Sequence, residues 1–256
     1  MSLITLTTDF GSVYPAAMKG VILSINPQVT IVDITHYIPH ADIRAGAFAL
    51  YSVVPYFPKG TVHVAVVDPG VGTARNSIVI YAGGHFFVGP DNGLMVPAAS
   101  SQGDMQICKI TNFGLLGDVS ATFHGRDVFA RIGAYLSGGM PLEEVGETTV
   151  DHVHLDFGTV ELGANFISGH VIDIDDFGNV ITNIQASDVF KKFHFEEHVR
   201  VFGKTISFLG TYGYAGEGEL LALIGSHGFL EIAVNGKSAA KRLKIQRGDE
   251  VRIKKR

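Results

Sequence analysis

The sequence has little cysteine, little charge and no long apolar run. Its one cysteine, Cys108, excludes a disulfide within the chain and a Cys-x-x-Cys metal knuckle. No segment approaches the roughly 18 continuous apolar residues that a membrane-spanning helix needs. The net charge of −5 argues against the basic face of a nucleic-acid-binding protein. The opening "MSLITLTTDF" lacks the charged start of a signal peptide, so we expect a cytoplasmic protein. From the charge and the short apolar runs, we expect it to bind neither nucleic acid nor membrane.

The first half of the chain alternates short apolar runs with helical patterns. Apolar residues make up 46% of the 256 residues, enough for one large core or two smaller ones. Strands are predicted over 3–8, 29–34 and 61–68, with a hairpin in "NSIVIYA" and "HFFVGPDNG". Helices are predicted over 14–25, over 42–57 with a cap at Asp42 and an interruption near Pro55, and over 125–139. This alternation predicts an α/β domain over 1–155, with a mostly parallel sheet flanked by helices.

After about residue 150 the pattern changes to alternating strands separated by glycine turns. Helical periodicity recurs only over 186–193. Short strands at regular spacing are typical of a small barrel or sandwich. We therefore predict a smaller all-β barrel domain over 165–256.

Three acids lie at or near the ends of predicted strands of the first domain, and glycine-containing turns follow two of them. They are Asp9 in "TTDFG", Asp33 in "IVDITH" and Asp68 in "VVDPGVGTAR". An acid at this position either caps a turn or contacts a ligand, because ligands of open parallel sheets bind beyond the carboxyl ends of the strands. The third motif also contains Arg75, and we expect its glycine-rich turn to bring this positive charge back toward Asp68.

The usual nucleotide and metal signatures are not present. "GVGTAR" lacks the last glycine of the dinucleotide pattern, and "EIAVNGKSA" lacks the first glycine of a Walker A loop. "DHVHLD" places His152, His154 and Asp156 on one face of a strand, but exposed polar residues are the better explanation of this pattern. We predict no catalytic metal and no cofactor.

Further polar residues stand where they can either form turns or bind a ligand. His124 precedes a predicted helix, beside a glycine. In the second domain the polar and aromatic candidates are Asp175, Phe177, Asn179, Ser226, His227, Glu231 and Asn235. An aromatic ring flanked by amides and acids suits a planar, polar-edged ligand such as adenine, although hairpin turns use the same residue types.

The motifs taken together resemble one family, the S-adenosyl-L-methionine hydroxide adenosyltransferases, which are related to the fluorinase and chlorinase. The matching segments are "TTDFG", "DITH", "VVDPGVGT-R", "GPDNGL", "FHGRDVF", "DDFGNVITNI" and "GSHGFLEIAVN". They extend from residue 7 to residue 235. The resemblance implies a homotrimer, with each site between the first domain of one subunit and the second domain of its neighbour. It implies hydrolysis of S-adenosyl-L-methionine to adenosine and L-methionine by attack of water or hydroxide on ribose C5′.

The resemblance also implies the catalytic residues. Asp68, Arg75 and His124 match the Asp–Arg–His set of the family members that use water. The halogenases lack this set, and the fluorinase has a long insertion before "GPDNGL" where this chain has a tight hairpin. Arg75 would stabilise hydroxide-like charge, while His124 and Asp68 would hydrogen-bond the water. Which of them removes the proton stays open.

Binding roles follow residue by residue from the same resemblance. Asp9 matches the acid that holds the ribose hydroxyls, and Tyr14 lies near the methionine end. Asp175 matches the acid that takes the methionine ammonium. Residues implied at the adenosine pocket, the methionine carboxylate or the adenine edge are Phe177, Asn179, Ser226, His227, Glu231, Val234, Asn235 and Gly236. Ala41 stands where the fluorinase has tryptophan.

Two other functions remain compatible with these residues. A halogenase of the same family would form a halogenated deoxyadenosine when halide is present. A non-catalytic adenosine or S-adenosyl-L-methionine binding protein would bind without turnover.

Overall fold

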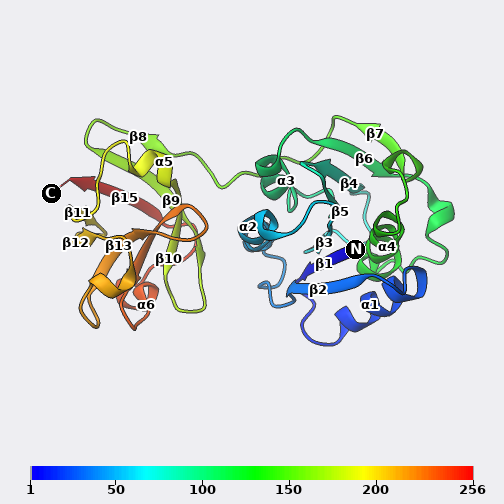
Figure 1. The fold of residues 1–256 in the computed structure, drawn as a ribbon, viewed down its shortest axis with the longest axis horizontal. Helices are drawn as coiled ribbons and strands as arrows, with labels where there is room; N and C mark the ends of the chain where they lie inside the picture. The colour runs from blue at the N-terminus through cyan, green and yellow to red at the C-terminus, as the bar shows by residue number, and fades with distance from the viewer. Residues whose placement is uncertain (1, 256) are drawn as a thin grey trace. The chain divides into compact units, whose positions relative to one another are not determined.

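The computed structural model describes residues 2–255, which divide into two compact units (Figure 1). The first unit runs to Asp156 and the second begins at Phe157. The segment from 157 to 164, which the sequence left between the two predicted domains, belongs to the second unit. Within the described part of the chain, every helix is too short or too polar to cross a membrane.

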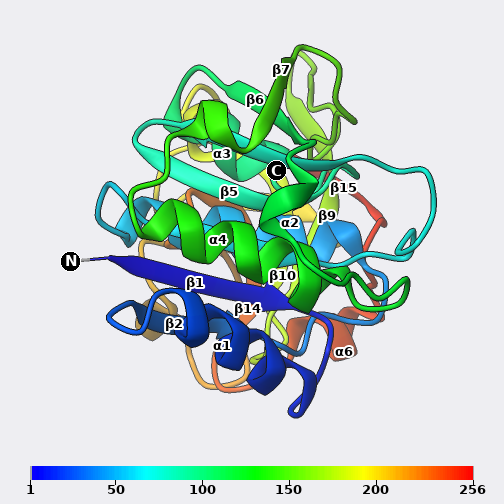
Figure 2. The same ribbon diagram turned by 90° about the vertical axis from the view of Figure 1, so that its right-hand side faces the viewer.

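The first unit is a seven-stranded sheet with helices on both faces. Its strands are β1 (Leu3–Thr8), β2 (Thr30–Thr35), β3 (Val62–Val66), β4 (Ser77–Ala82), β5 (His85–Pro90), β6 (Gln106–Ile110) and β7 (Gly146–Thr149). Its helices are α1 (Tyr14–Ile25), α2 (Ile43–Val53), α3 (Val96–Gln102) and α4 (Ala130–Ser137). Helices α1 and α4 pack together on one face of the sheet, and α2 and α3 pack together on the other (Figures 1 and 2).

The strand order of this sheet is β2-β1-β3-β5-β4-β6-β7. The first four strands are parallel, whereas β4, β6 and β7 add three antiparallel pairings, so the sheet is mixed. Alternation of the side chains explains why both faces are covered. Ile4 and Leu6 of β1 pack into the α1–α4 core, while Thr5 between them points to the opposite face and contacts His63.

The second unit is a closed barrel. Its strands are β8 (Glu161–Leu162), β9 (Phe166–Ile174), β10 (Val180–Gln185), β11 (His198–Val201), β12 (Lys204–Phe208), β13 (Leu220–Ile224), β14 (Phe229–Val234) and β15 (Glu250–Lys255). The sheet order runs from β10 through β14, β13, β12, β11 and β15 to β9, and β9 pairs back to β10. Seven strands thus close the barrel around one apolar core, and β8 adds to β9 outside it. The predicted fold class, α/β followed by a β-barrel, is confirmed.

Several predicted helices are shorter in the structure. The helix expected over 42–57 ends at Val53 and continues as a 3-10 turn, Val54–Tyr56, at the interruption predicted near Pro55. The pattern over 125–139 contains a π-helical turn, Gly125–Phe129, before α4 begins. Of 186–193, only α5 (Ala186–Val189) is helical. Helix α3 and the five-residue α6 (Ala239–Leu243) were not predicted, because both are too short to show a helical period.

Candidate active site

Two acids lie at the carboxyl ends of neighbouring parallel strands. Asp9 directly follows β1, and Asp68 follows β3 by two residues. In open sheets this edge is where ligands bind. Asp33, the remaining acid of the three noted in the sequence, lies inside β2 instead. It pairs with Lys19 at 2.5 Å and His36 at 3.0 Å, so its carboxylate belongs to a network that ties β2 to α1.

The loop from Asp68 to Arg75 is tightly turned. The Thr73 hydroxyl donates to the Gly70 carbonyl at 2.7 Å. Gly72 has a φ of 75°, and a Cβ at this position would lie 2.4 Å from the carbonyl oxygen of Ala121. Glycine is therefore required both for the backbone conformation and for the close approach of the chain. The turn brings the last residue of the loop back beside the first.

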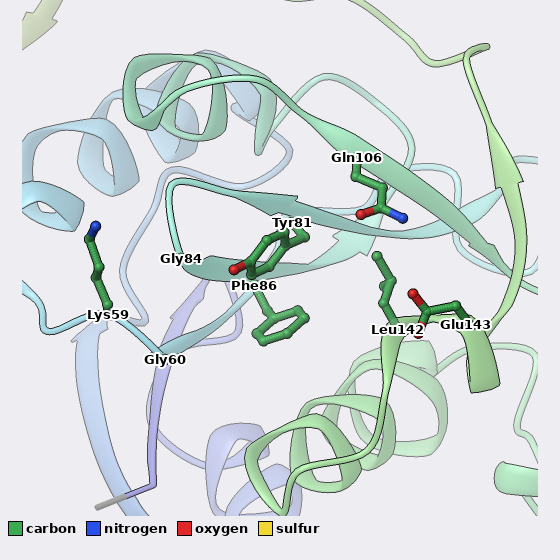
Figure 3. A pocket seen from close by; sticks show the side chains of 8 residues that line it. All are labelled: Lys59, Gly60, Tyr81, Gly84, Phe86, Gln106, Leu142 and Glu143. Atoms are coloured by element: carbon green, nitrogen blue, oxygen red, sulfur yellow. The ribbon is translucent and has the colours of Figure 1, made fainter.

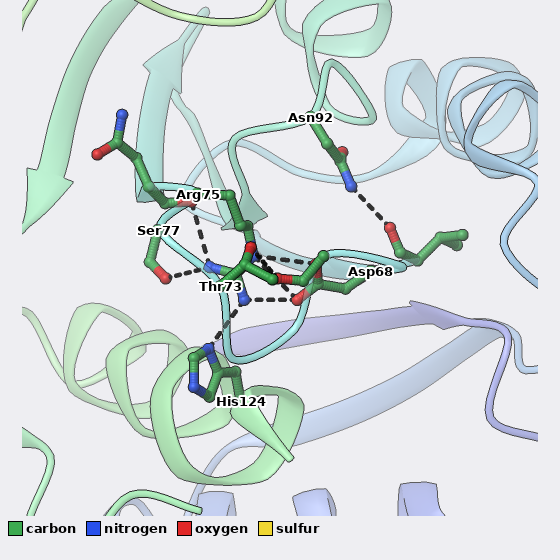
Figure 4. A network of polar contacts seen from close by, with 9 residues as sticks. Asp68, Thr73, Arg75, Ser77, Asn92 and His124 are labelled. Atoms are coloured by element: carbon green, nitrogen blue, oxygen red, sulfur yellow. Dashed lines mark hydrogen bonds and ion pairs between the residues drawn. The ribbon is translucent and has the colours of Figure 1, made fainter. Parts of the chain in front are cut away.

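Arg75 makes a two-pronged ion pair with Asp68 (Figure 4). Its Nε lies 2.9 Å from Asp68 Oδ1, and its Nη2 lies 2.5 Å from Oδ2. Its Nη1 donates to the Ser77 hydroxyl at 2.8 Å and to the Asn76 carbonyl at 3.2 Å. The guanidinium also lies 5.3 Å from the centre of the Phe129 ring. The side chains of Asp68 and Arg75 are 4% and 12% exposed, so salt screens their pairing only weakly.

His124 joins this pair from 49 residues further along the chain, where it immediately precedes the π-helical turn. Its Nδ1 lies 2.9 Å from Arg75 Nη2. Burial lowers the pKa of His124 below 6.5 and the charge of Arg75 lowers it further, whereas Asp68 and Asp127 oppose the shift. The structure thus brings together all three predicted catalytic residues, with a histidine that is neutral at neutral pH.

Gly125, beside this histidine, leaves room for an aromatic ring. A Cβ on Gly125 would lie 2.8 Å from the ring of Phe10, the residue after Asp9. The Phe10 ring packs edge-on against Phe123, with ring centres 5.6 Å apart. The space beside Gly125 is therefore filled by the protein, and this packing ties the end of β1 to the turn that carries His124.

Asp9 is held by the loop that precedes α2. Its side chain is 6% exposed, and its Oδ2 accepts the Ala41 N–H at 2.9 Å. His40 Nδ1 lies 3.3 Å from the same oxygen. Ala41 has a φ of 60°, a conformation uncommon for a residue with a side chain. Tyr14, at the start of α1, is 62% exposed, as a residue that contacts a ligand can be.

In the second unit, the turn between β9 and β10 is built around Asp175. Its carboxylate accepts the backbone N–H of Asn179 at 2.8 Å and the side-chain amide of Asn179 at 2.9 Å. These bonds fold the turn so that Phe177 at its tip is 80% exposed. The ring of Phe177 is therefore accessible to a ligand. Asn179 itself is buried.

A buried carboxylate, that of Glu231 on β14, anchors the turn before that strand. Its Oε1 accepts the hydroxyl of Tyr212 at 2.7 Å, and its Oε2 lies 3.3 Å from His227 Nε2. His227 Nδ1 accepts the backbone N–H of Phe229 at 3.2 Å, so the ring donates from Nε2 to the glutamate. Burial, the bond to Glu231 and the nearby Asp175 raise the pKa of Tyr212. Glu231 therefore holds the turn that presents the exposed Ser226.

The last predicted residues form the turn after β14. Val234 is buried in the barrel core, and Gly236 has a φ of 76°. The amide of Asn235 donates to the Ala215 carbonyl at 2.8 Å. Val234 packs inward, so only its backbone can meet a ligand. The predicted residues of the first unit thus lie at the carboxyl edge of its sheet. Those of the second unit lie at both ends of β14: the β9–β10 turn and Asn235–Gly236 at one end, and Ser226 and His227 at the other.

Sequence reasoning missed several residues that hold this site in place. The Ser77 hydroxyl accepts a hydrogen bond from Arg75 Nη1. The side-chain amide of Asn92 donates at 2.8 Å to the carbonyl of Val67, the residue directly before Asp68. Asn92 stands in "GPDNGL", so the motif signalled it without indicating its contact. Ser77 is the polar first residue of an otherwise apolar strand, which is a weak signal. Nothing in the sequence around Tyr212 pointed to Glu231.

Two hollows on the first unit bear on where a ligand can bind. One, of about 360 Å³, is bordered by Arg75, Ser77 and His124 together with apolar side chains of β6 and the segment after it. The other, of about 540 Å³, lies near the β4–β5 turn and is lined by Lys59, Gly60, Tyr81, Gly84, Phe86, Gln106, Leu142 and Glu143 (Figure 3). The larger hollow contains no predicted site residue and lies at the amino ends of β3 and β5, opposite the ligand-binding edge. Between residues 2 and 255, no group of three or more His, Cys, Asp and Glu side chains is arranged to hold a metal ion.

The fold and the site together define a class of two-domain proteins: an α/β unit with a partly buried Asp–Arg–His set at its carboxyl edge, followed by a closed β-barrel. Residues 4–146 match the S-adenosyl-L-methionine (SAM) hydroxide adenosyltransferase N-terminal domain, and residues 169–252 match the C-terminal domain of the same family. The chain belongs to the SAM hydroxide adenosyltransferase family, as the motifs suggested.

Full-length relatives carry two different names. An (R)-S-adenosyl-L-methionine hydrolase of Salinispora tropica is 40% identical, and the comparison covers 98% of this chain and 97% of the relative. A fluorinase of Actinoplanes is 27% identical over 94% of this chain and 92% of its own. A crystal structure of an uncharacterised conserved protein from Thermotoga maritima is 37% identical with a TM-score of 0.93, covering 99% of this chain and 100% of that one. The hydrolase is thus clearly more similar than the fluorinase.

Proposed function

We propose that the protein hydrolyses S-adenosyl-L-methionine to adenosine and L-methionine. The oxygen of water or hydroxide attacks ribose C5′, the C5′–S bond breaks, and its electron pair stays on the sulfur of methionine. One proton is released when water is the nucleophile. Because the leaving group departs from a sulfonium as a neutral thioether, the reaction needs no general acid, and we propose no cofactor.

The observation that carries this proposal is the joined set of Asp68, Arg75 and His124. Water is a poor nucleophile and hydroxide is rare at neutral pH, so the step that needs help is nucleophile activation. A buried carboxylate fixed by a guanidinium, with a neutral imidazole beside it, is suited to hold and deprotonate water. The 40% identity to a protein named (R)-S-adenosyl-L-methionine hydrolase supports the same reaction.

We assign the remaining predicted residues to substrate binding. The Asp9 carboxylate would accept the ribose hydroxyls, because a carboxylate accepts several hydrogen bonds at once. Tyr14 would lie near the methionine end. In the second unit, Asp175 would take the ammonium group and Phe177 would contact the adenine. Asn179, Ser226, His227, Glu231, Val234, Asn235 and Gly236 would complete the pocket, Val234 through its backbone.

We further propose a homotrimer with substrate sites at the subunit interfaces, located in the cytoplasm. The assembly rests on the family resemblance, and the location rests on a chain with one cysteine, which suits a reducing compartment. Light scattering after gel filtration tests the assembly. The expected mass is about three times the 27.4 kDa of one chain, and a monomer that turns over substrate would exclude the interfacial site.

The test of the reaction is to incubate the protein with S-adenosyl-L-methionine in ¹⁸O-labelled water and separate the products by chromatography. We expect adenosine with the label on its 5′ oxygen, together with methionine, whether or not chloride is added. Asp68→Ala should lower turnover by about 100-fold or more, as loss of a group that stabilises a transition state does. Asp104→Ala, which removes an exposed acid elsewhere in the same unit, is the matched control and should leave turnover unchanged.

Three results would contradict the proposal in different ways. Chlorinated deoxyadenosine formed only with chloride would establish a halogenase. Tight binding without turnover, unchanged in Asp68→Ala, would establish a binding protein. Unlabelled adenosine would show that the oxygen does not come from water.

A further inference from the structure

Arg75 has five N–H groups, and every one of them meets an acceptor. Nε–H is shared between the two oxygens of Asp68, at 2.9 and 3.1 Å. The two hydrogens of Nη2 serve Asp68 Oδ2 and His124 Nδ1. The two hydrogens of Nη1 serve the Asn76 carbonyl and the Ser77 hydroxyl. A guanidinium has five donors and no acceptor, so this arrangement leaves none for a bound nucleophile.

We propose that Ser77 is a positioning residue of this site, whose hydroxyl fixes Arg75 so that the guanidinium orients Asp68 and His124 instead of contacting the nucleophile. This inference rests on the hydrolysis proposed above and changes the role of Arg75 from a direct contact to an organising one. Nη1 is the guanidinium nitrogen that makes no contact with Asp68, and its side-chain acceptor is the Ser77 hydroxyl at 2.8 Å (Figure 4). The other acceptor on that side is the backbone carbonyl of Asn76, and the Phe129 ring adds a contact at 5.3 Å.

The position of Arg75 settles which group can remove a proton. Because Arg75 can only donate, His124 Nδ1 must be the acceptor in the contact at 2.9 Å. A neutral imidazole has one lone pair, and here it is already used. His124 therefore carries its proton on Nε2 and can donate a hydrogen bond to water but cannot act as the base. Asp68 retains carboxylate lone pairs beyond those that Arg75 uses, so it is the acceptor of the set.

The groups that face His124 agree with this protonation state. Arg75 favours the neutral ring, whereas Asp68 and Asp127 favour the charged ring. Burial and Arg75 prevail, so the pKa of His124 lies below 6.5. If Arg75 loses the acceptor that holds its Nη1, its hold on His124 weakens and the pKa of His124 should rise toward 6.5. The titration of His124 thus reports the position of Arg75 independently of any turnover.

The experiment compares Ser77→Ala with Ser77→Thr in the full-length protein. Ser77→Ala removes the acceptor, and kcat should fall about tenfold, the effect of one hydrogen bond to a charged group, while KM stays within about twofold. Ser77→Thr keeps the hydroxyl in a strand position that tolerates a β-branched residue, and should restore kcat to within about threefold. Ser101→Ala, which removes a hydroxyl that donates to the Ala98 carbonyl on α3, is the matched control and should change neither constant.

The second readout is ¹⁵N NMR of the histidine side chains. In the wild type, His124 should show an unprotonated Nδ1 and a protonated Nε2 at pH 7.5. Its titration midpoint should rise in Ser77→Ala and return in Ser77→Thr. A proton on His124 Nδ1 in the wild type would overturn the inference. A Ser77→Ala variant that keeps the wild-type kcat would also overturn it, and so would one in which kcat falls while the titration midpoint of His124 stays unchanged. If the wild type failed to hydrolyse the substrate but showed these NMR shifts, the positioning by Ser77 would stand and the proposed reaction would fall.

Discussion

Lowering the pH should destabilise the first unit through one buried histidine, His63 on β3. Its side chain is fully buried, with Nδ1 2.8 Å from the Thr5 hydroxyl and Nε2 3.2 Å from His85. The ring stacks on Phe87 at 5.1 Å between centres. Burial, with a smaller contribution from His85, lowers the pKa of His63 from 6.5 to about 3. The folded protein therefore keeps this ring neutral throughout the mildly acidic range.

The sign of the effect follows from proton binding in the two states. Below pH 6.5 the unfolded chain takes up a proton on His63 and the folded protein does not, so acid favours unfolding. The stability is fully present above pH 6.5 and is lost as the pH falls toward 3. Between pH 8 and pH 5, the loss from this one group is about 2 kcal/mol.

The assay is urea unfolding at pH 8 and pH 5 for the wild type and for His63→Gln, with the free energy extrapolated to water. Glutamine can still hydrogen-bond Thr5 but does not titrate. The wild type should lose about 2 kcal/mol more than His63→Gln between the two pH values, whatever the absolute stability of the variant. His170→Gln, at an exposed position on β9, is the control and should lose as much as the wild type. An equal loss in the wild type and His63→Gln would refute the reasoning.

Three further predictions concern the site. Asp9→Asn removes one acceptor for the ribose hydroxyls, so KM should rise about tenfold or more with a smaller change in kcat; an unchanged KM would remove Asp9 from the binding site. Gly72→Ala would place a methyl group 2.4 Å from a backbone carbonyl oxygen, at a φ of 75°. The kcat should therefore fall at least about tenfold and the melting temperature should drop, whereas a kcat and a melting temperature like those of the wild type would contradict the close approach. Tyr212→Phe removes the donor of Glu231 Oε1 and should destabilise the barrel by about 1–3 kcal/mol in urea unfolding, whereas Tyr214→Phe, at a residue 76% exposed, should have no measurable effect.

Elements with a clear period were predictable from the sequence, and short or interrupted ones were not. The strand over 3–8 and the helix over 14–25 have the predicted bounds, because their apolar spacing and local chemistry agree with the tertiary fold. The helix over 125–139 was only partly right. A π-helical turn at Gly125–Phe129 adds a residue to one turn, and no periodicity of 3.6 signals that. Helix α6 has five residues and depends on the Ser238 side chain, which accepts the Lys241 N–H at its start.

The candidate site was predictable as a set of residues but not as a set of contacts. Asp68 and Arg75 are seven residues apart in a glycine-rich loop, so a local ion pair could be suspected from the sequence. The family resemblance supplied His124. Ser77 and Tyr212 escaped detection because their roles depend on partners that only the folded chain places next to them.

The sequence by itself determined the local features of this protein: alternating apolar strands, glycine turns that reverse the chain, and an acid at the end of β1 and just beyond β3. These follow from backbone sterics and side-chain periodicity, which act over a few residues. Only the tertiary structure decided the protonation of its histidines and the orientation of Arg75. Those properties depend on burial and on hydrogen bonds between residues far apart in sequence, such as Arg75 and His124, and such contacts exist only once the first unit has folded.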